Sequence, residues 1–314
     1  MNTQTNGVPE SPLDPQVIAP APTTTMTQTR PMYWSVRREL WENRSIYIAP
    51  LAVAALVLLG FLISATHLPD TMRAVLALDP AQQRAAIDKP YSIAAFLILL
   101  TAFIVGVFYC LDALHGERRD RSILFWKSLP VSDLTTVLAK ASIPLAVLPL
   151  LVFAIIVATQ MIMLLLATAV LLTSGVSAAA LWTQLPLFQM PLALLYGLAT
   201  LALWHAPLYG WLLLVSAWAR RTTFLWAVLT PLAICIFEKI AFNTSYFASL
   251  LKYLLIGWFT QAFVIQDPGS VAIDPLAQLA PGKFLGTPGL WIGLVVAAAF
   301  LAAAVWLRRY REPI

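Results

Sequence analysis

Long apolar runs constrain this chain more than any other feature of its sequence. A helix needs about 20 apolar residues to cross the hydrocarbon core of a bilayer. The 314 residues are 60% hydrophobic and only 11% charged, which excludes an ordinary soluble globular domain. We therefore expect an all-α polytopic membrane protein with six transmembrane helices, at about 46–64, 91–114, 145–172, 192–217, 224–237 and 290–307.

The distribution of basic residues orients these helices, because cytoplasmic loops carry an excess of Lys and Arg. The segment 115–140 holds the densest cluster of charge, and arginines also precede the first run and follow the fourth and the last. Both chain termini are then cytoplasmic, which requires an even number of crossings. Parity indicates that residues 246–265 do not cross, but form a re-entrant or surface helical element within an outer segment, 238–289.

The N-terminal region divides into two parts. Residues 1–30 are rich in Pro, Thr and Gln and lack an apolar core, so we expect a disordered cytoplasmic tail rather than a signal peptide. In residues 31–45, Met32, Val36 and Leu40 recur at helical spacing among charged residues. This pattern predicts an interfacial helix with its apolar side in the lipid headgroups, rather than a plain linker. Its candidate interfacial residues are Tyr33, Trp34, Arg37, Arg38 and Trp41.

Prolines suggest where other elements end. Residues 67–90 contain three prolines and are expected to form an outer loop with one short helix near 74–77. Residues 133–172 stay compatible with helix over a length too great for one upright span. We expect Pro144 and Pro149 to divide them into a cytoplasmic approach and a span, because an interior proline removes a hydrogen bond.

Motifs for catalysis are missing from the sequence. Gly282 and Lys283 lack the upstream glycine and the Ser/Thr of a phosphate-binding loop, so ATP hydrolysis by this chain is not expected. Cys110 and Cys235 lie in apolar runs without metal-ligand spacing and are interpreted as packing residues. His205 is the only titratable residue near the middle of a span, and we favour a packed histidine over a proton relay, a ligand or an intramembrane enzyme. Basic residues gather at the ends of apolar runs, which argues against nucleic-acid binding.

The charged segment itself carries an amphipathic pattern. Ile123, Trp126 and either Leu129 or Pro130 recur near helical spacing beside the arginines, which predicts a short amphipathic helix lying across the membrane face. Such a helix is a docking surface for a soluble partner. Just before it, Asp112 is expected to pair with Arg118 or Arg119.

From Tyr109 to Ser132 the sequence follows the pattern Y-x-x-D-x-L-x-x-E-R-x-D-x-S-I-x-F-W-x-S-L-P-V-S, with Lys140 further on. This pattern resembles the permeases of ABC-2 type transporters, in which the stretch joins the second and third membrane helices and seats the ATPase subunit. The likeness extends over residues 31–314, through the interfacial helix, the six spans, the cytoplasmic ends and the long outer segment. The N-terminal tail has no counterpart in that family.

The resemblance implies the permease subunit of an ABC exporter in the plasma membrane, the inner membrane of a bacterium. Two copies would pair as a homodimer, each bound to a separately encoded subunit that holds ATP and Mg²⁺, while this chain binds no cofactor. Apolar residues would fill a groove on the ATPase and charged ones would form a polar rim. The alternative is a non-transporting membrane scaffold that recruits a soluble partner through the same segment. Largely apolar spans favour an amphiphilic substrate over a small ion. The implied ATPase-coupling residues are Glu117, Arg118, Arg119, Asp120, Arg121, Phe125, Trp126, Leu129 and Pro130.

Overall fold

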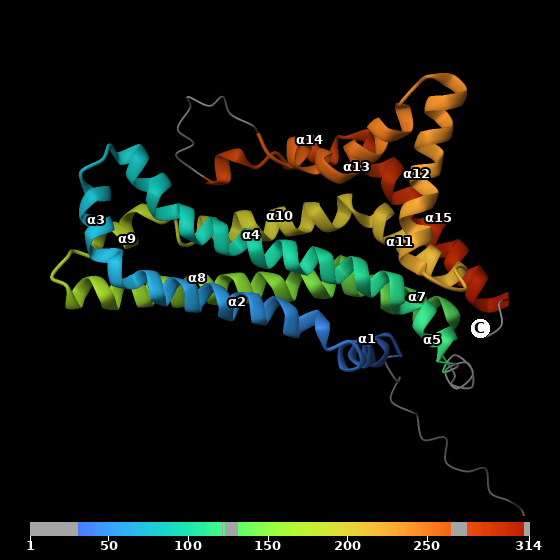
Figure 1. Cartoon of the computed structure of the whole chain (residues 1–314), viewed down its shortest axis with the longest axis horizontal. Coiled ribbons are helices and arrows are strands. Elements are labelled where there is room, and N and C mark those ends of the chain that lie inside the picture. Colours follow the sequence, from blue (N-terminus) through green and yellow to red (C-terminus); the bar gives the residue numbers. More distant parts are fainter. Residues whose placement is uncertain (1–30, 121, 123–130, 265–274, 311–314) are drawn as a thin grey trace, which may run out of the picture.

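A computed structural model describes residues 31–120, 122, 131–264 and 275–310 of the chain (Figure 1). In these residues the fold is all-α, as expected. Five helical stretches are long and apolar enough to cross a membrane, or six if a bent pair of helices counts as one span. The elements are α1 (Pro31–Glu42), α2 (Ser45–Ser64), η1 (Ala65–His67), α3 (Leu68–Leu76), α4 (Pro80–Ala113), α5 (His115–Arg119), α7 (Asp133–Ser142), η2 (Ile143–Val147), α8 (Leu148–Thr173), α9 (Ala179–Gln184), α10 (Gln189–Trp204), α11 (Ala206–Trp218), α12 (Thr223–Phe242), α13 (Tyr246–Ala262), η3 (Pro275–Gln278), α14 (Pro281–Leu285) and α15 (Pro288–Tyr310).

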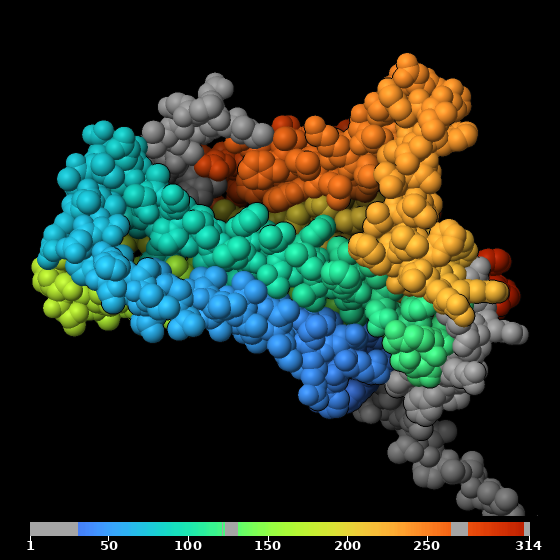
Figure 2. Space-filling model, viewed as in Figure 1, coloured from blue at the N-terminus to red at the C-terminus, as the bar shows by residue number. Residues whose placement is uncertain are grey.

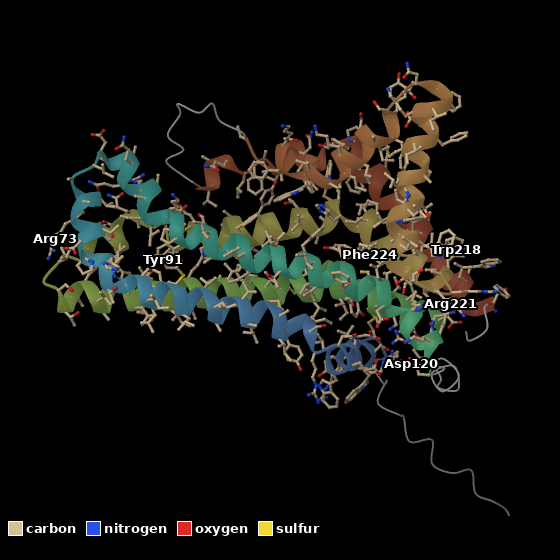
Figure 3. The ribbon with its side chains drawn as sticks, viewed as in Figure 1. Arg73, Tyr91, Asp120, Trp218, Arg221 and Phe224 are labelled. Atoms are coloured by element: carbon tan, nitrogen blue, oxygen red, sulfur yellow. The ribbon has the colours of Figure 1, made fainter. Side chains whose placement is uncertain are left out.

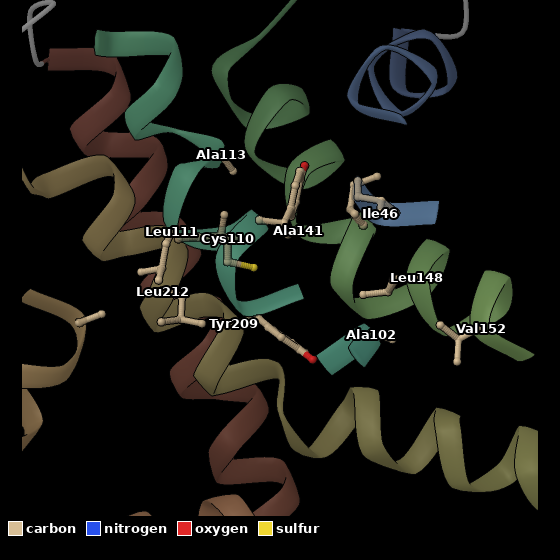
Figure 4. Close-up of a cluster of buried hydrophobic side chains, with 14 of the residues drawn as sticks. Ile46, Ala102, Cys110, Leu111, Ala113, Ala141, Leu148, Val152, Tyr209 and Leu212 are labelled. Atoms are coloured by element: carbon tan, nitrogen blue, oxygen red, sulfur yellow. The ribbon is translucent and has the colours of Figure 1, made fainter. Parts of the chain in front are cut away.

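The core of the bundle lies where α2, α4, α8 and α11 meet (Figure 4). Gly106 of α4 lies at a close approach in this core, since a Cβ placed there would lie 3.2 Å from the Leu148 side chain and 3.6 Å from that of Tyr209. Small residues at such crossings let membrane helices pack closely where no hydrophobic effect drives them together. Cys110 is fully buried in this core, in agreement with a packing role.

Helix α15 packs along α11, and a glycine again allows the close contact. A Cβ at Gly210 would lie 3.2 Å from the backbone oxygen of Ala297 and 3.4 Å from its Cα, so the two backbones nearly touch. This contact joins the last described helix to the middle of the chain.

The structure corrects the expected loop at 67–90. The residues form η1, α3 and the first turns of α4, which runs unbroken from Pro80 through Pro90 to Ala113. Pro80 stands in the first turn of α4, where backbone N–H groups make no hydrogen bond within the helix, so the absence of an N–H on proline costs nothing there. Proline therefore starts a helix here instead of ending one.

Near Pro144, where a division was expected, the chain stays helical from Asp133 to Thr173. A π-helical turn, η2, contains Pro144 and separates α7 from α8, and Pro149 lies in the first turn of α8. The wider turn accommodates the proline ring without breaking the rod.

The fourth expected span is broken in its middle. Helices α10 and α11 meet at His205 with a bend of 48°. Pro207, in the first turn of α11, cannot donate to the carbonyl of Leu203, which weakens the helix at this point. The Trp204 indole N–H donates to the Leu254 carbonyl at 3.0 Å, so α13 supports the bend from the side.

Helix α12 is longer than the expected span 224–237, because it continues through Pro231 and Glu238 to Phe242. The Glu238 carboxylate then accepts hydrogen bonds from the backbone N–H groups of Tyr246 at 2.6 Å and Phe247 at 2.8 Å. A carboxylate at this position caps the positive end of α13 and closes a helical hairpin. The expected helical element at 246–265 is present as α13, which is not among the stretches long enough to cross a membrane.

Helix α12 stands away from the bundle (Figure 2). Large apolar side chains are exposed along most of its length. A surface of this kind is stable against lipid acyl chains or a neighbouring membrane helix. The exposed residues include Phe224, Leu225, Val228, Leu229, Leu232, Ile236, Phe237 and Ile240.

Candidate functional site: a buried ion-pair cluster

Five helices bring charged or hydroxyl side chains together at one end of the bundle, the end where α1, α5 and the end of α15 lie (Figure 1). We call this group the ion-pair cluster. Its members are Arg38 and Glu39 of α1, Tyr109 of α4, Glu117 of α5, Asp133 and Lys140 of α7, and Arg308 of α15.

Glu39 lies at the centre of the cluster and is only 1% exposed. Its Oε1 atom lies 2.8 Å from Lys140 Nζ and 2.8 Å from Arg38 Nη2, and its Oε2 accepts a hydrogen bond from the Tyr109 hydroxyl at 2.9 Å. Burial alone would raise the pKa of the Glu39 carboxyl, but the charge and hydrogen bond of Lys140, helped by Arg38, lower it below its ordinary value of 4.5. Glu39 is therefore a carboxylate in the folded chain.

Glu117 is the second acceptor. Its Oε1 lies 2.9 Å from Arg38 Nη2 and 3.1 Å from Lys140 Nζ, and its Oε2 lies 3.1 Å from Arg308 Nη2. Arg308 also reaches Asp133, with Nη1 3.4 Å from Oδ1. One carboxylate of α5 thus joins α1, α7 and α15.

The formal charges of these seven side chains balance, and the half-exposed Glu42 lies at their edge, 3.5 Å from Arg38 Nε. Arg38, Lys140 and Arg308 carry three positive charges, and the two glutamates with Asp133 carry three negative ones. Burying ions costs several kcal/mol each, and their mutual attraction offsets this cost only when the geometry is good. Such a cluster adds little net stability, but it strongly penalises any arrangement in which one partner is missing.

A second set of contacts fastens α5 to the end of α11. The Ser216 hydroxyl oxygen accepts hydrogen bonds from the backbone N–H groups of Leu114 at 3.0 Å and His115 at 2.9 Å. The Arg118 guanidinium donates to the Ala217 carbonyl at 2.7 Å. A cation at the carboxyl end of a helix satisfies carbonyls that have no helical partner and complements the helix dipole.

The residues expected to form a charged rim around a partner separate into two groups. Glu117 and Arg118 are buried and bind other helices of this chain, so they do not lie on an exposed rim. Arg119 and Asp120 are exposed and pair with each other at 3.0 Å (Figure 3). Arg119 also lies 3.8 Å from Asp112, which confirms the expected partner of that carboxylate. Arg121, Phe125, Trp126, Leu129 and Pro130 lie outside the described residues.

The interfacial helix α1 has two different faces. Tyr33, Trp34 and Trp41 are exposed, and the Arg37 guanidinium stacks 5.3 Å from the Trp34 ring centre and 4.9 Å from that of Trp41. Val36 and Leu40, expected among the headgroups, instead pack against the bundle core, and Arg38 of the expected interfacial set joins the cluster. The apolar stripe faces protein because the adjacent Glu39 must reach its buried partners.

His205 lies outside the cluster, at the bend between α10 and α11. Its ring is buried, lies edge-on to Phe103 with centroids 5.6 Å apart, and has Nδ1 2.9 Å from the Leu201 carbonyl oxygen. This environment agrees with the packed histidine that the sequence favoured. Across the ranges 31–120, 122, 131–264 and 275–310, no group of His, Cys, Asp or Glu side chains is arranged to hold a metal ion.

Comparison of this chain with protein-family models, characterised proteins and solved structures gives no match. The sequence and structure establish an integral membrane protein with five or six candidate spans.

Proposed function

We propose that this chain is the membrane-spanning permease subunit of an ABC exporter of the ABC-2 type. The observation that carries the proposal is the fastening of α5, the start of the charged segment, to the surrounding helices. Glu117 joins it to α1, α7 and α15, and Arg118 joins it to α11. A soluble domain pushing on this segment would act on all of these helices together. A loop that only sets topology works equally well when it is fully solvated.

In this proposal the exposed Arg119 and Asp120 and the following residues, with Trp126 and Leu129 as apolar anchors, meet a separate ATP-binding subunit. That subunit holds ATP and Mg²⁺, and this chain performs no hydrolysis. The cluster end faces the cytoplasm, in line with the basic residues around it. Two permease copies and two ATPase subunits would form one transporter.

The bend at His205 supports transport over a static scaffold. Helix α11 is fastened to α5 at its far end and to α15 at Gly210, whereas α10 continues beyond the bend towards the other end of the bundle. A displacement of α5 would therefore change the angle between the two halves of this span. Discontinuous helices serve this purpose in many transporters.

The experiment measures vanadate-sensitive phosphate release by the full chain purified with its ATP-binding partner from native membranes. We expect Trp126→Ala combined with Leu129→Ala to abolish this activity, because both apolar anchors are removed. Trp41→Ala, which removes an exposed tryptophan of α1, is the matched control and should retain it. Activity that is absent from the wild-type preparation, or equal in the double variant, would refute the proposal.

A second measurement separates an exporter from a scaffold without knowledge of the substrate. Spin labels at Leu192→Cys near the start of α10 and Trp218→Cys at the end of α11, both exposed positions, report the distance across the bend in a Cys235→Ser background. We expect this distance to change when the complex is trapped with ATP and vanadate. A distance that stays constant while ATP is hydrolysed would favour the scaffold.

A further inference from the structure

The turn between α11 and α12 presents two adjacent cations. Arg220 and Arg221 are exposed, and neither forms an ion pair with any residue that the structure describes. The nearby carboxylates Asp112 and Asp120 are paired with Arg119 instead. Two exposed guanidinium groups therefore remain available to an anion.

The start of α12 adds backbone donors beside these cations. Thr222, the N-cap residue, adopts a left-handed conformation with φ 47°, and its side chain makes no capping hydrogen bond. The Thr222 carbonyl accepts from Leu225 N at 3.0 Å and Trp226 N at 3.4 Å, so it serves residues further along the helix. Those two N–H groups are engaged, and the N–H groups of Thr223 and Phe224 stand before them at the positive end of this 20-residue helix, where helices leave donors for an anion.

Aromatic rings flank the turn (Figure 3). Phe224 stacks on Phe108 of α4 with centroids 6.2 Å apart, and Trp226 lies edge-on to Trp218 at 5.0 Å. Aromatic side chains of this kind gather where headgroups meet acyl chains. From Phe224 to Phe237 the exposed side chains of α12 are apolar, so the arginines lie within one helical turn of an apolar surface suited to lipid.

We infer that this turn binds the headgroup of an anionic phospholipid. The phosphate oxygens accept hydrogen bonds from Arg220, Arg221 and the first turn of α12, while the acyl chains lie against Phe224 and Trp226. Arginine suits this role because its planar group contacts a phosphate through two donors at once. The inference depends on the membrane fold alone and holds whether or not the chain transports anything.

The proposed lipid site lies next to the hydrogen bonds that hold α5 against the end of α11. The Ala219 carbonyl, directly before Arg220, lies 3.2 Å from His115 Nδ1 and accepts a hydrogen bond from Arg118 at 3.4 Å. A bound headgroup therefore steadies the same turn that holds the charged segment in place. The lipid composition of the membrane thus acts on the position of α5.

The experiment is native mass spectrometry of the full chain in detergent, titrated with dioleoyl phosphatidylglycerol or dioleoyl phosphatidylcholine. Wild-type protein is expected to retain the anionic lipid in preference to the zwitterionic one. The variant R220Q/R221Q should bind phosphatidylglycerol roughly thirtyfold more weakly, since each arginine near an anionic surface contributes about 1 kcal/mol and about 1.4 kcal/mol corresponds to tenfold. Binding of phosphatidylcholine should not change.

The variant R73Q/R84Q is the matched control, because it removes the same charge from α3 and the start of α4, at the end of the bundle opposite to Arg221 (Figures 1 and 3). Equal weakening in both double variants would show that net charge alone governs binding, and would overturn the site. Wild-type protein that does not discriminate between the two lipids would also overturn it, even if the variants failed to fold. If inorganic phosphate at the lipid concentration displaced the lipid, the site would bind free anions rather than lipid. Weaker association of R220Q/R221Q with the ATP-binding subunit, with lipid retention unchanged, would assign the turn to that protein.

Discussion

The contact between Lys140 and Glu39 is the sharpest test of the ion-pair cluster. The two residues come from α7 and α1, their charged atoms lie 2.8 Å apart, and both side chains are almost fully buried. Replacing Lys140 by Met keeps the length of the side chain and removes its charge. Replacing Glu39 by Gln keeps the shape of the side chain and removes the opposite charge.

The expected magnitudes follow from the charge balance of the cluster. Either single variant leaves one uncompensated buried charge, which costs about 3–5 kcal/mol of unfolding free energy. The double variant restores equal numbers of positive and negative groups, because Arg38 and Arg308 then face Glu117 and Asp133. Its loss should fall at least about 2 kcal/mol below the sum of the single losses, as close charge pairs in dry surroundings show.

The assay is equilibrium unfolding in mixed micelles with increasing sodium dodecyl sulfate, followed by far-UV circular dichroism. The control cycle is Arg73→Met with Asp70→Asn on α3, whose charged atoms also lie 2.8 Å apart but whose side chains are 59% and 81% exposed. This pair should give a coupling energy of about 1 kcal/mol or less. Additive losses at Lys140 and Glu39 would refute the argument that the cluster acts as one unit.

Three further predictions concern single side chains. The pKa of Glu39 in the folded chain is lowered, so the carboxylate contributes fully to stability above pH 4.5, and this contribution is lost as the pH falls through the folded-state pKa. The difference in unfolding free energy between wild type and Glu39→Gln, measured by the same sodium dodecyl sulfate titration, should therefore shrink only below pH 4.5. Ser216→Ala leaves two buried backbone N–H groups at the start of α5 without an acceptor, and should lower the unfolding free energy by about 1–3 kcal/mol in the same assay. The control Ser64→Ala, at an exposed helix end, should lower it by about 0.5 kcal/mol or less. Glu238→Ala should accelerate amide hydrogen exchange in the first turn of α13, measured by mass spectrometry, while Lys239→Ala should not, because only the carboxylate caps those N–H groups.

The spans were predictable from the sequence because a helix that crosses lipid needs a long run of apolar residues, and such a run can be recognised without knowing the fold. Helix α2 begins and ends within one residue of the expected 46–64. The loop expected at 67–90 was wrong because its prolines were interpreted as breaks in helical structure. Pro80 instead starts α4, and α12 continues beyond the expected end at 237 to Phe242.

The ion-pair cluster was not predictable in the same way, because its partners are far apart in the sequence. The charged residues of segment 115–140 were expected to form the rim of a partner-binding surface, whereas Glu117 and Arg118 are buried. One signal was present: Glu39 stands on the same helical face as Val36, beside Leu40, so a carboxylate interrupts an apolar stripe. Such an interruption indicates a buried cation elsewhere, but only the fold shows that it comes from α7.

The order in which the cluster is completed has a consequence for biosynthesis. Arg38 and Glu39 leave the ribosome first, Glu117 and Lys140 follow, and Arg308 emerges only with the end of α15. Until then Glu117 has two of its three cations, and Asp133 lacks its contact with Arg308. A nascent or truncated chain without α15 therefore has an electrostatically incomplete cluster, with Glu117 and Asp133 both short of a cation.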